Sequence, residues 1–266
     1  MNRDHEVTTG MTGMTGMTGV TGVTGMTGIA GIAGMTRRDV VRHTAVLGTV
    51  ALAGGGSLLA LPTAASAAGR SGPDGTPGRP TSPNGWEVEE RANDVSTVWT
   101  RRIPGTPCDL DVRLGDVATV LTHVVRRFHY EIDELRAGDL TGWRAPFRVR
   151  LDRPEGNQAS GTAVAIRPGS YPPGARGGFF PVQLAVVRDI LAECDGVVRW
   201  AGDEDRPYEA LFSIDVSPGD ERLTKLVARL RGWADDPGAG PGTPVDVTDK
   251  RRRRAAEALE RRQKSA

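Results

Sequence analysis

The sequence predicts an α+β domain with a small, largely antiparallel sheet and about three helices. Three stretches with apolar residues at every third or fourth position predict helices, and each follows two short runs that alternate as strands do. Strands that follow one another without a helix between them pair antiparallel, whereas a parallel pair needs a long crossover connection. The order of the elements therefore favours an antiparallel sheet over a doubly wound parallel one.

The expected strands are separated by turn residues. Pro104 and Gly105 stand between the first two, because proline lacks an amide hydrogen for the ladder and glycine readily adopts turn conformations. A polar loop joins the third and fourth strands. The predicted ranges are 96–103, 108–114, 147–151, 162–166, 197–200 and 210–216.

The expected helices have recognisable starts. The first covers 116–135, with Asp116 as its N-cap and one continuous apolar stripe. The second begins at Pro181 and ends before Gly196. The third covers 217–233, with a Ser-Pro cap and first position at 217–218.

A three-residue repeat fills much of the first 34 residues. Met-Thr-Gly or Val-Thr-Gly recurs through 11–28 without a charge or an aromatic residue, so this segment cannot build a core. Three residues are also too few to form a stacking repeat unit. We expect that translation starts at Met35 and that residues 1–34 are not part of the true protein.

Residues 35–67 predict export by the twin-arginine route. Arg37 and Arg38 precede an uncharged apolar run to Leu61, and the small-residue motif Ala-Ser-Ala at 65–67 suits a signal peptidase. These features predict a secreted or cell-envelope protein that engages the export machinery. A membrane anchor that is never cut is the open alternative.

Composition divides the remaining chain into three parts. Residues 68–85 are a Pro/Gly/Ser linker, 86–233 form the predicted domain, and 234–266 combine a Pro/Gly linker with a basic tail. The formal net charge is +1, which gives no general case for nucleic acid as a partner.

The basic tail has two interpretations. One is a solvated, fraying helix; the other is contact with anionic wall polymers or lipid head groups. Its acidic residues are Glu257 and Glu260, and its basic residues are Lys250, Arg251, Arg252, Arg253, Arg254, Arg261, Arg262 and Lys264.

The cysteines and histidines of the predicted domain do not form a recognisable metal or thiol site. Cys108 and Cys194 are too far apart in sequence for a zinc knuckle, and the open alternatives are a disulfide or two buried small hydrophobic residues. His123 and His129 lie six residues apart, about 120° around a helix, and do not share a face. We expect them at the surface or at the boundary of the core.

Two segments carry a family resemblance. The first, at 157–166, reads Asn-Gln-Ala-Ser-Gly-Thr-Ala-Val-Ala-Ile, and the second, at 199–212, begins Arg-Trp-Ala-Gly-Asp and ends Glu-Ala-Leu-Phe. Together they resemble the zinc D-alanyl-D-alanine carboxypeptidases and related peptidoglycan endopeptidases of the hedgehog/DD-peptidase fold. The resemblance covers about 147–216 and implies a DD-peptidase-like domain.

The resemblance also implies that the zinc ligands are gone. Gln158, Ala165 and Leu211 stand where those enzymes have His, Asp and His, and Tyr208 stands where they have the catalytic acid. A catalytic zinc needs about three nitrogen, sulfur or carboxylate donors and an open position for water. Glutamine offers a weak neutral oxygen, and alanine and leucine offer nothing. We therefore expect neither zinc nor another cofactor, and no catalytic residue.

The scaffold that remains suggests binding. Arg167 and Arg199 are candidates to pair with a peptide carboxylate, and Trp200 to pack on a sugar or an alanine methyl, although Trp200 also fits a core position. The full set of binding candidates is Asn157, Ser160, Arg167, Arg199, Trp200 and Glu209.

Three functions remain open. The first is an exported, non-catalytic protein that binds peptidoglycan or a partner. The second is an active peptidoglycan metallopeptidase with a non-standard site that draws on His123, His129 and Glu209. The third is a structural envelope protein, because a fold does not dictate a function.

Overall fold

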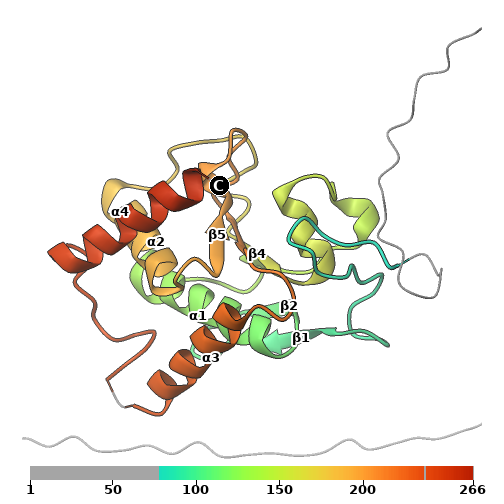
Figure 1. Ribbon diagram of the computed structural model, residues 1–266, viewed down its shortest axis with the longest axis horizontal. Helices are drawn as coiled ribbons and strands as arrows, with labels where there is room; N and C mark the ends of the chain where they lie inside the picture. Colours follow the sequence, from blue (N-terminus) through green and yellow to red (C-terminus); the bar gives the residue numbers. More distant parts are fainter. Residues whose placement is uncertain (1–77, 237, 266) are drawn as a thin grey trace, which may run out of the picture. The chain divides into compact units, whose positions relative to one another are not determined.

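The computed structural model describes residues 78–236 and 238–265. The repeat at 1–34, the export signal at 35–67 and most of the linker at 68–85 lie outside the described residues. The described strands are β1 (Val98–Arg102), β2 (Asp109–Arg113), β3 (Leu140–Thr141), β4 (Ala163–Ile166), β5 (Val198–Trp200) and β6 (Leu211–Ile214). The α-helices are α1 (Asp116–Glu131), α2 (Pro181–Glu193), α3 (Glu221–Ala234) and α4 (Lys250–Lys264), as Figure 1 shows. Three 3-10 helices cover Pro146–Arg148, Pro154–Ser160 and Ala201–Asp203.

The strands form two antiparallel sheets. The first is the β1–β2 hairpin, and the second has the order β3-β4-β6-β5 with every neighbouring pair antiparallel. The expectation of an α+β domain with a small antiparallel sheet is confirmed. Strands that are close in sequence need not be neighbours, however, since β6 lies between β4 and β5.

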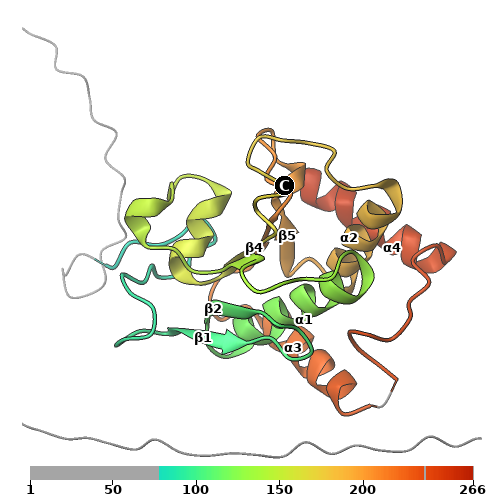
Figure 2. The ribbon, with the colours of Figure 1, turned by 180° about the vertical axis from the view of Figure 1, so that it is seen from behind.

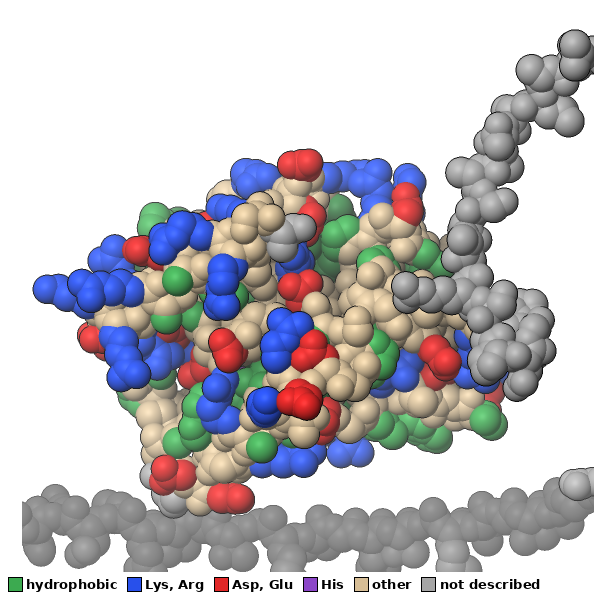
Figure 3. All heavy atoms as spheres, in the orientation of Figure 1, with side chains coloured by type: hydrophobic (Ala, Val, Ile, Leu, Met, Phe, Trp, Pro, Cys, Tyr) green, Lys and Arg blue, Asp and Glu red, His purple; other side chains and the backbone are tan. Residues whose placement is uncertain are grey.

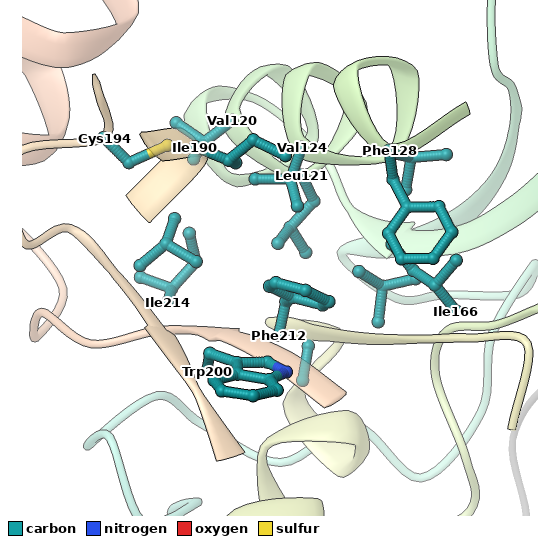
Figure 4. Packing of buried hydrophobic residues seen from close by; sticks show 14 of the residues in the cluster. Val120, Leu121, Val124, Phe128, Ile166, Ile190, Cys194, Trp200, Phe212 and Ile214 are labelled. Atoms are coloured by element: carbon teal, nitrogen blue, oxygen red, sulfur yellow. The ribbon is translucent and has the colours of Figure 1, made fainter. Parts of the chain in front are cut away.

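The two faces of the larger sheet have different neighbours. Phe212 pairs with Val164 on one side and with Trp200 on the other, so these residues share a face. Figure 4 shows Phe212, Trp200 and Ile214 pointing toward the apolar residues of α1 and α2. Ala165 and Leu211 lie on the opposite face, because neighbouring residues of a strand alternate. The 3-10 helix Pro154–Ser160 contacts both of their strands.

The expected strand at 147–151 is wrong. Pro146 begins a 3-10 turn there, and the side chain of Phe147 is exposed. The place beside β4 belongs to β3, where Leu140 pairs with Ile166 and Thr141 pairs with Ala165. Alternation alone cannot distinguish a paired strand from an exposed loop with the same pattern.

Two helix starts also differ from the sequence expectation. Gly115 is the N-cap of α1, and Asp116 is its first residue. The cap of α3 is Asp220, whose carboxylate accepts a hydrogen bond from the backbone N–H of Arg222, so the cap predicted at Ser217 is wrong. The cause is Gly219, whose φ of 82° is not helical and delays the helix.

Part of the predicted N-terminal linker belongs to the domain. The hydroxyl of Ser82 donates to that of Ser160 at 2.8 Å. The side-chain amide of Asn84 donates to the Thr162 hydroxyl and to the Ile214 carbonyl, each at 2.8 Å. Residues just before the domain boundary predicted at 86 therefore bond to the domain, although their segment is rich in Pro, Gly and Ser.

The basic tail is a packed helix rather than a fraying one. Figures 1 and 2 show α4 beside α2, and these two helices are in contact. Ala256 and Leu259 are buried, and the amide of Gln263 donates to the Val198 carbonyl at 2.9 Å. Helix α4, which lies beyond the predicted domain end at 233, thus packs on α2 and β5 of the domain.

Cys108 and Cys194 are free thiols, so the disulfide alternative is wrong. Both are buried, and the Cys108 thiol donates to the Arg136 carbonyl at 3.1 Å. Burial raises the pKa of Cys194 to about 12, which leaves almost no reactive thiolate at neutral pH.

We expect the native protein to resist alkylation by iodoacetamide. Both thiols should react once the protein is denatured, and mass spectrometry measures the number of alkylated cysteines. Fewer than two reactive thiols in the denatured, unreduced protein would contradict this assignment.

Candidate functional site

Two of the three positions that the sequence resemblance aligns with zinc ligands face each other across neighbouring strands. Ala165 of β4 is the direct partner of Leu211 of β6. Directly opposite residues of an antiparallel pair have Cα atoms about 5 Å apart and side chains on the same face. Both residues are fully buried. The antiparallel register thus places these two side chains next to each other.

The third position, Gln158, lies in the 3-10 helix Pro154–Ser160, which contacts β4 and β6. Its side-chain nitrogen donates to the carbonyls of Thr141 at 3.0 Å and Gly142 at 2.9 Å. Thr141 is itself the ladder partner of Ala165. Gln158 therefore contacts β3, the strand next to Ala165, while Leu211 lies on the strand at the other side of Ala165.

The chemistry of these three residues does not fit a zinc ion. Gln158 turns its amide nitrogen toward backbone carbonyls, and its Oε1 is buried without a hydrogen-bond partner among the described residues. The other two side chains are hydrocarbon and offer no lone pair. Across the described ranges, no three His, Cys, Asp or Glu side chains are arranged to hold a metal ion. Gln158, Ala165 and Leu211 therefore do not offer the His, Asp and His donors that the carboxypeptidases use.

A cavity of about 350 Å³ lies between the start of the 3-10 helix Pro154–Ser160 and the segment before β6. Tyr208, which the resemblance aligns with a catalytic acid, lines it three residues before Leu211, and Pro154 and Glu155 line it from the 3-10 helix that carries Gln158. Burial is the main cause that raises the pKa of Tyr208, so its hydroxyl is neutral and can donate a hydrogen bond. The remaining lining residues are Asp152, Arg153, Pro173, Ala201, Glu204, Asp205 and Arg206.

The cavity walls carry charges of both signs. Arg153 has a buried Nε without a hydrogen-bond partner in the described part of the chain, and Arg206 is exposed. Neither of these two guanidinium groups forms an ion pair with any described residue. Glu155 and Asp205 supply carboxylates on the same walls. A groove of this kind can hold a small ligand that carries both a carboxylate and an ammonium group.

Asn157 and Ser160 do not line this cavity but hold the N-terminal segment. Both are buried. The side-chain oxygen of Asn157 accepts a hydrogen bond from the backbone N–H of Asn84 at 3.1 Å, and Ser160 accepts the Ser82 hydroxyl. Their hydrogen-bonding groups are used within the fold, and their expected role in ligand binding stays a prediction.

Trp200 and Glu209 are also structural. Trp200 is 3% exposed, and its indole N–H donates to the Glu209 carbonyl at 2.7 Å. The Glu209 carboxylate accepts the backbone N–H groups of Gly177 and Gly178 at 2.7 and 2.8 Å. The Glu209 carboxylate thus holds the loop before α2, and a role of Trp200 and Glu209 in ligand binding stays a prediction.

The arginines expected to bind a carboxylate already have acidic partners. Arg167 forms an ion pair with Asp133. The Arg199 guanidinium lies 3.0 Å from the Asp215 carboxylate and 3.7 Å from that of Glu204. The arginines that do line the cavity, Arg153 and Arg206, were missed: Arg153 stands in a loop before the first segment, and Arg206, inside the second, matches no motif position of the resemblance. In the sequence, the only sign that Arg153 lies near the site is its position shortly before the segment 157–166.

His123 and His129 lie on α1, which covers the other face of the sheet. His123 is buried, against expectation, and its Nε2 lies 2.9 Å from the Glu193 carboxylate. The Nδ1 of His129 accepts the backbone N–H of Leu135 at 2.8 Å. Both rings have structural partners, so neither the surface placement of His123 nor a joint site with Glu209 agrees with the fold.

Comparison with known protein families, with curated proteins and with solved structures found no match to this chain. In the part of the chain that the structure covers, no helix combines the length and the apolar character needed to cross a membrane.

Proposed function

We propose that this chain is an exported cell-envelope protein whose domain binds wall peptide without metal catalysis. One observation supports the proposal: Ala165 and Leu211 are direct ladder partners, and Gln158 bonds to the carbonyl of Thr141, the other ladder partner of Ala165, in line with the resemblance to peptidoglycan carboxypeptidases. None of them supplies a zinc donor of the kind those enzymes use. The export part rests on Arg37 and Arg38 and the apolar run that follows them.

The cavity beside Tyr208 is the proposed peptide site. A stem peptide of the wall carries a free carboxylate, which suits Arg153 and Arg206, and amino groups, which suit Glu155 and Asp205. The neutral Tyr208 hydroxyl supplies a donor at the place where the related enzymes have an acid. This set replaces the binding residues expected from the sequence, which are used within the fold.

Removing the cavity groups should weaken peptide binding. We expect Arg206→Glu and Tyr208→Ala each to reduce the affinity for a muropeptide with a free C-terminal carboxylate by about 10-fold, the effect of losing one hydrogen bond to a charged group. Isothermal titration calorimetry on the mature protein measures this. Arg148→Glu is the matched control, because Arg148 is exposed and does not line the cavity.

Experiments on the same mature protein distinguish the proposed function from the other two functions. Stoichiometric bound zinc together with muropeptide cleavage would overturn the proposal in favour of an active metallopeptidase. Failure of the wild-type protein to bind either muropeptide or insoluble wall material would favour a structural envelope protein. Equal binding by Arg206→Glu, Tyr208→Ala and Arg148→Glu would move the peptide site elsewhere.

A further inference from the structure

Helix α4 is held on the domain at both of its ends. Asp249 caps its first turn by accepting the backbone N–H groups of Arg251 and Arg252. The Arg252 guanidinium donates to the Asp189 carboxylate at 2.7 and 2.6 Å. At the other end, Gln263 bonds to the Val198 carbonyl. The helix therefore presents a fixed outer face rather than a fluctuating tail.

That outer face is strongly basic. Five exposed cations on this face form no ion pair with any described residue. The face is long, because Lys250 and Arg261 lie about 16 Å apart along the helix axis at 1.5 Å per residue. Figure 3 shows the Lys and Arg side chains gathered over α4 at the left of the view. The nearest acid of the helix, Glu257, pairs with Arg253 at 3.8 Å. The five outer cations are Lys250, Arg251, Arg254, Arg261 and Arg262.

The charge arrangement is unfavourable for the isolated helix. Five consecutive basic residues at 250–254 occupy its N-terminal end, where the helix dipole is positive and acidic residues are preferred, and the first turn holds no acid. Lys250 and Arg254 are also like charges four residues apart on one face. Neutralisation by a bound anion would remove both unfavourable terms.

We infer that the outer face of α4 binds an extended anionic polymer of the envelope that carries a phosphate or carboxylate in each repeat unit. Charge complementarity selects a polyanion. A bilayer is disfavoured because the outer face bears no large apolar side chain to insert, Leu259 being buried. Single-stranded nucleic acid is disfavoured because α4 has no aromatic residue on which bases can stack. This inference does not depend on the proposed peptide site, but its envelope source rests on the export that is part of the proposed function.

The test uses long-chain inorganic polyphosphate as the probe and the full mature chain. If all five cations engage, log K should fall against log salt with a slope of about −3.5, taking about 0.7 for each contact with a single-stranded polyanion. The variant Lys250→Gln/Arg254→Gln/Arg261→Gln keeps two of the five cations, so its slope should be shallower, about −1.4. Its affinity for polyphosphate at low salt should be about a hundredfold weaker. The helix should remain folded, because its buried contacts are untouched.

The control removes the same charge elsewhere. Arg101→Gln/Arg136→Gln/Arg148→Gln changes three exposed arginines outside α4 and should leave affinity and slope close to wild type. Equal losses in both variants would overturn the inference, since net charge alone would then explain binding. Tighter binding to phosphatidylglycerol vesicles or to duplex DNA than to polyphosphate would also overturn it. Muropeptide affinity should not change in either variant, which separates this face from the cavity.

Discussion

The triple change Gln158→His, Ala165→Asp and Leu211→His is expected to create a tight zinc site. Ala165 and Leu211 are already ladder partners, and Gln158 already reaches the strand beside them. Without metal, a buried aspartate and two buried imidazoles should destabilise the domain by several kcal/mol. Zinc at a thousand times its dissociation constant should return about 4 kcal/mol of stability. Thermal denaturation with and without zinc, together with metal analysis, measures both effects.

The double variant Gln158→His/Leu211→His is the matched control for the zinc site. It retains Ala165 and lacks the carboxylate ligand, so its affinity for zinc should be much weaker, because a zinc site with two protein ligands is incomplete. A folded triple variant that binds zinc no better than the double variant would mean that the three positions do not aim at one point. The alignment with the carboxypeptidases would then have to be abandoned.

The change Arg127→Met is expected to reduce the free energy of unfolding by about 3–5 kcal/mol, which urea denaturation measures. The Arg127 side chain is 2% exposed and joins α1 to α2. Its guanidinium lies 3.0 Å from the Asp189 carboxylate and 2.7 Å from that of Glu193, and it also pairs with Glu131. Removing the cation leaves buried carboxylates with too little compensating charge.

A surface ion pair provides the comparison for Arg127. Lys225 pairs with Glu221 at 2.9 Å on the exposed side of α3, and Lys225→Met should change the stability by less than about 1 kcal/mol. Similar losses for the two variants would mean that the Arg127 cluster is effectively solvated and contributes little.

The same cluster predicts a loss of stability in acid. Burial by itself raises the pKa of Glu193, but the hydrogen bond with His123 and the charge of Arg127 outweigh it and lower that pKa to about 2. A carboxyl whose folded pKa lies below its usual 4.5 stabilises the fold above pH 4.5 and loses this contribution as the pH falls toward 2. The Glu193→Gln variant should therefore show a shallower decline over that interval.

Much of the sheet was accessible from the sequence, because apolar alternation and turn residues mark β1, β2, β4, β5 and β6. The third strand was not, since Leu140–Thr141 is too short to carry a pattern, whereas the segment at Phe147 carries one and stays outside the sheet. Turn chemistry likewise decided the start of α3 through Gly219. Short strands and caps depend on tertiary pairing and on single φ values, which periodicity does not encode.

The charged side chains were the hardest to place. On α1, His123 and Arg127 fall outside the apolar stripe and have the pattern of a solvated surface. They are buried because Asp189 and Glu193 of α2 face them, with Arg252 of α4 on the same carboxylates. Such a cluster assembles from residues distant in sequence. Similarly, Trp200 and Glu209 were expected to serve a ligand, yet their polar groups complete hydrogen bonds within the fold.

The hydrogen bonds of Ser82 and Asn84 at one end and the packed α4 at the other have a practical consequence for recombinant work. A fragment cut at 86 and 233 would strip the partners from Thr162 and Ser160 and uncover the carboxylates of α2. A recombinant domain should therefore keep both segments, from residue 78 to residue 265. Truncations made inside those limits would report on a damaged molecule rather than on the native protein.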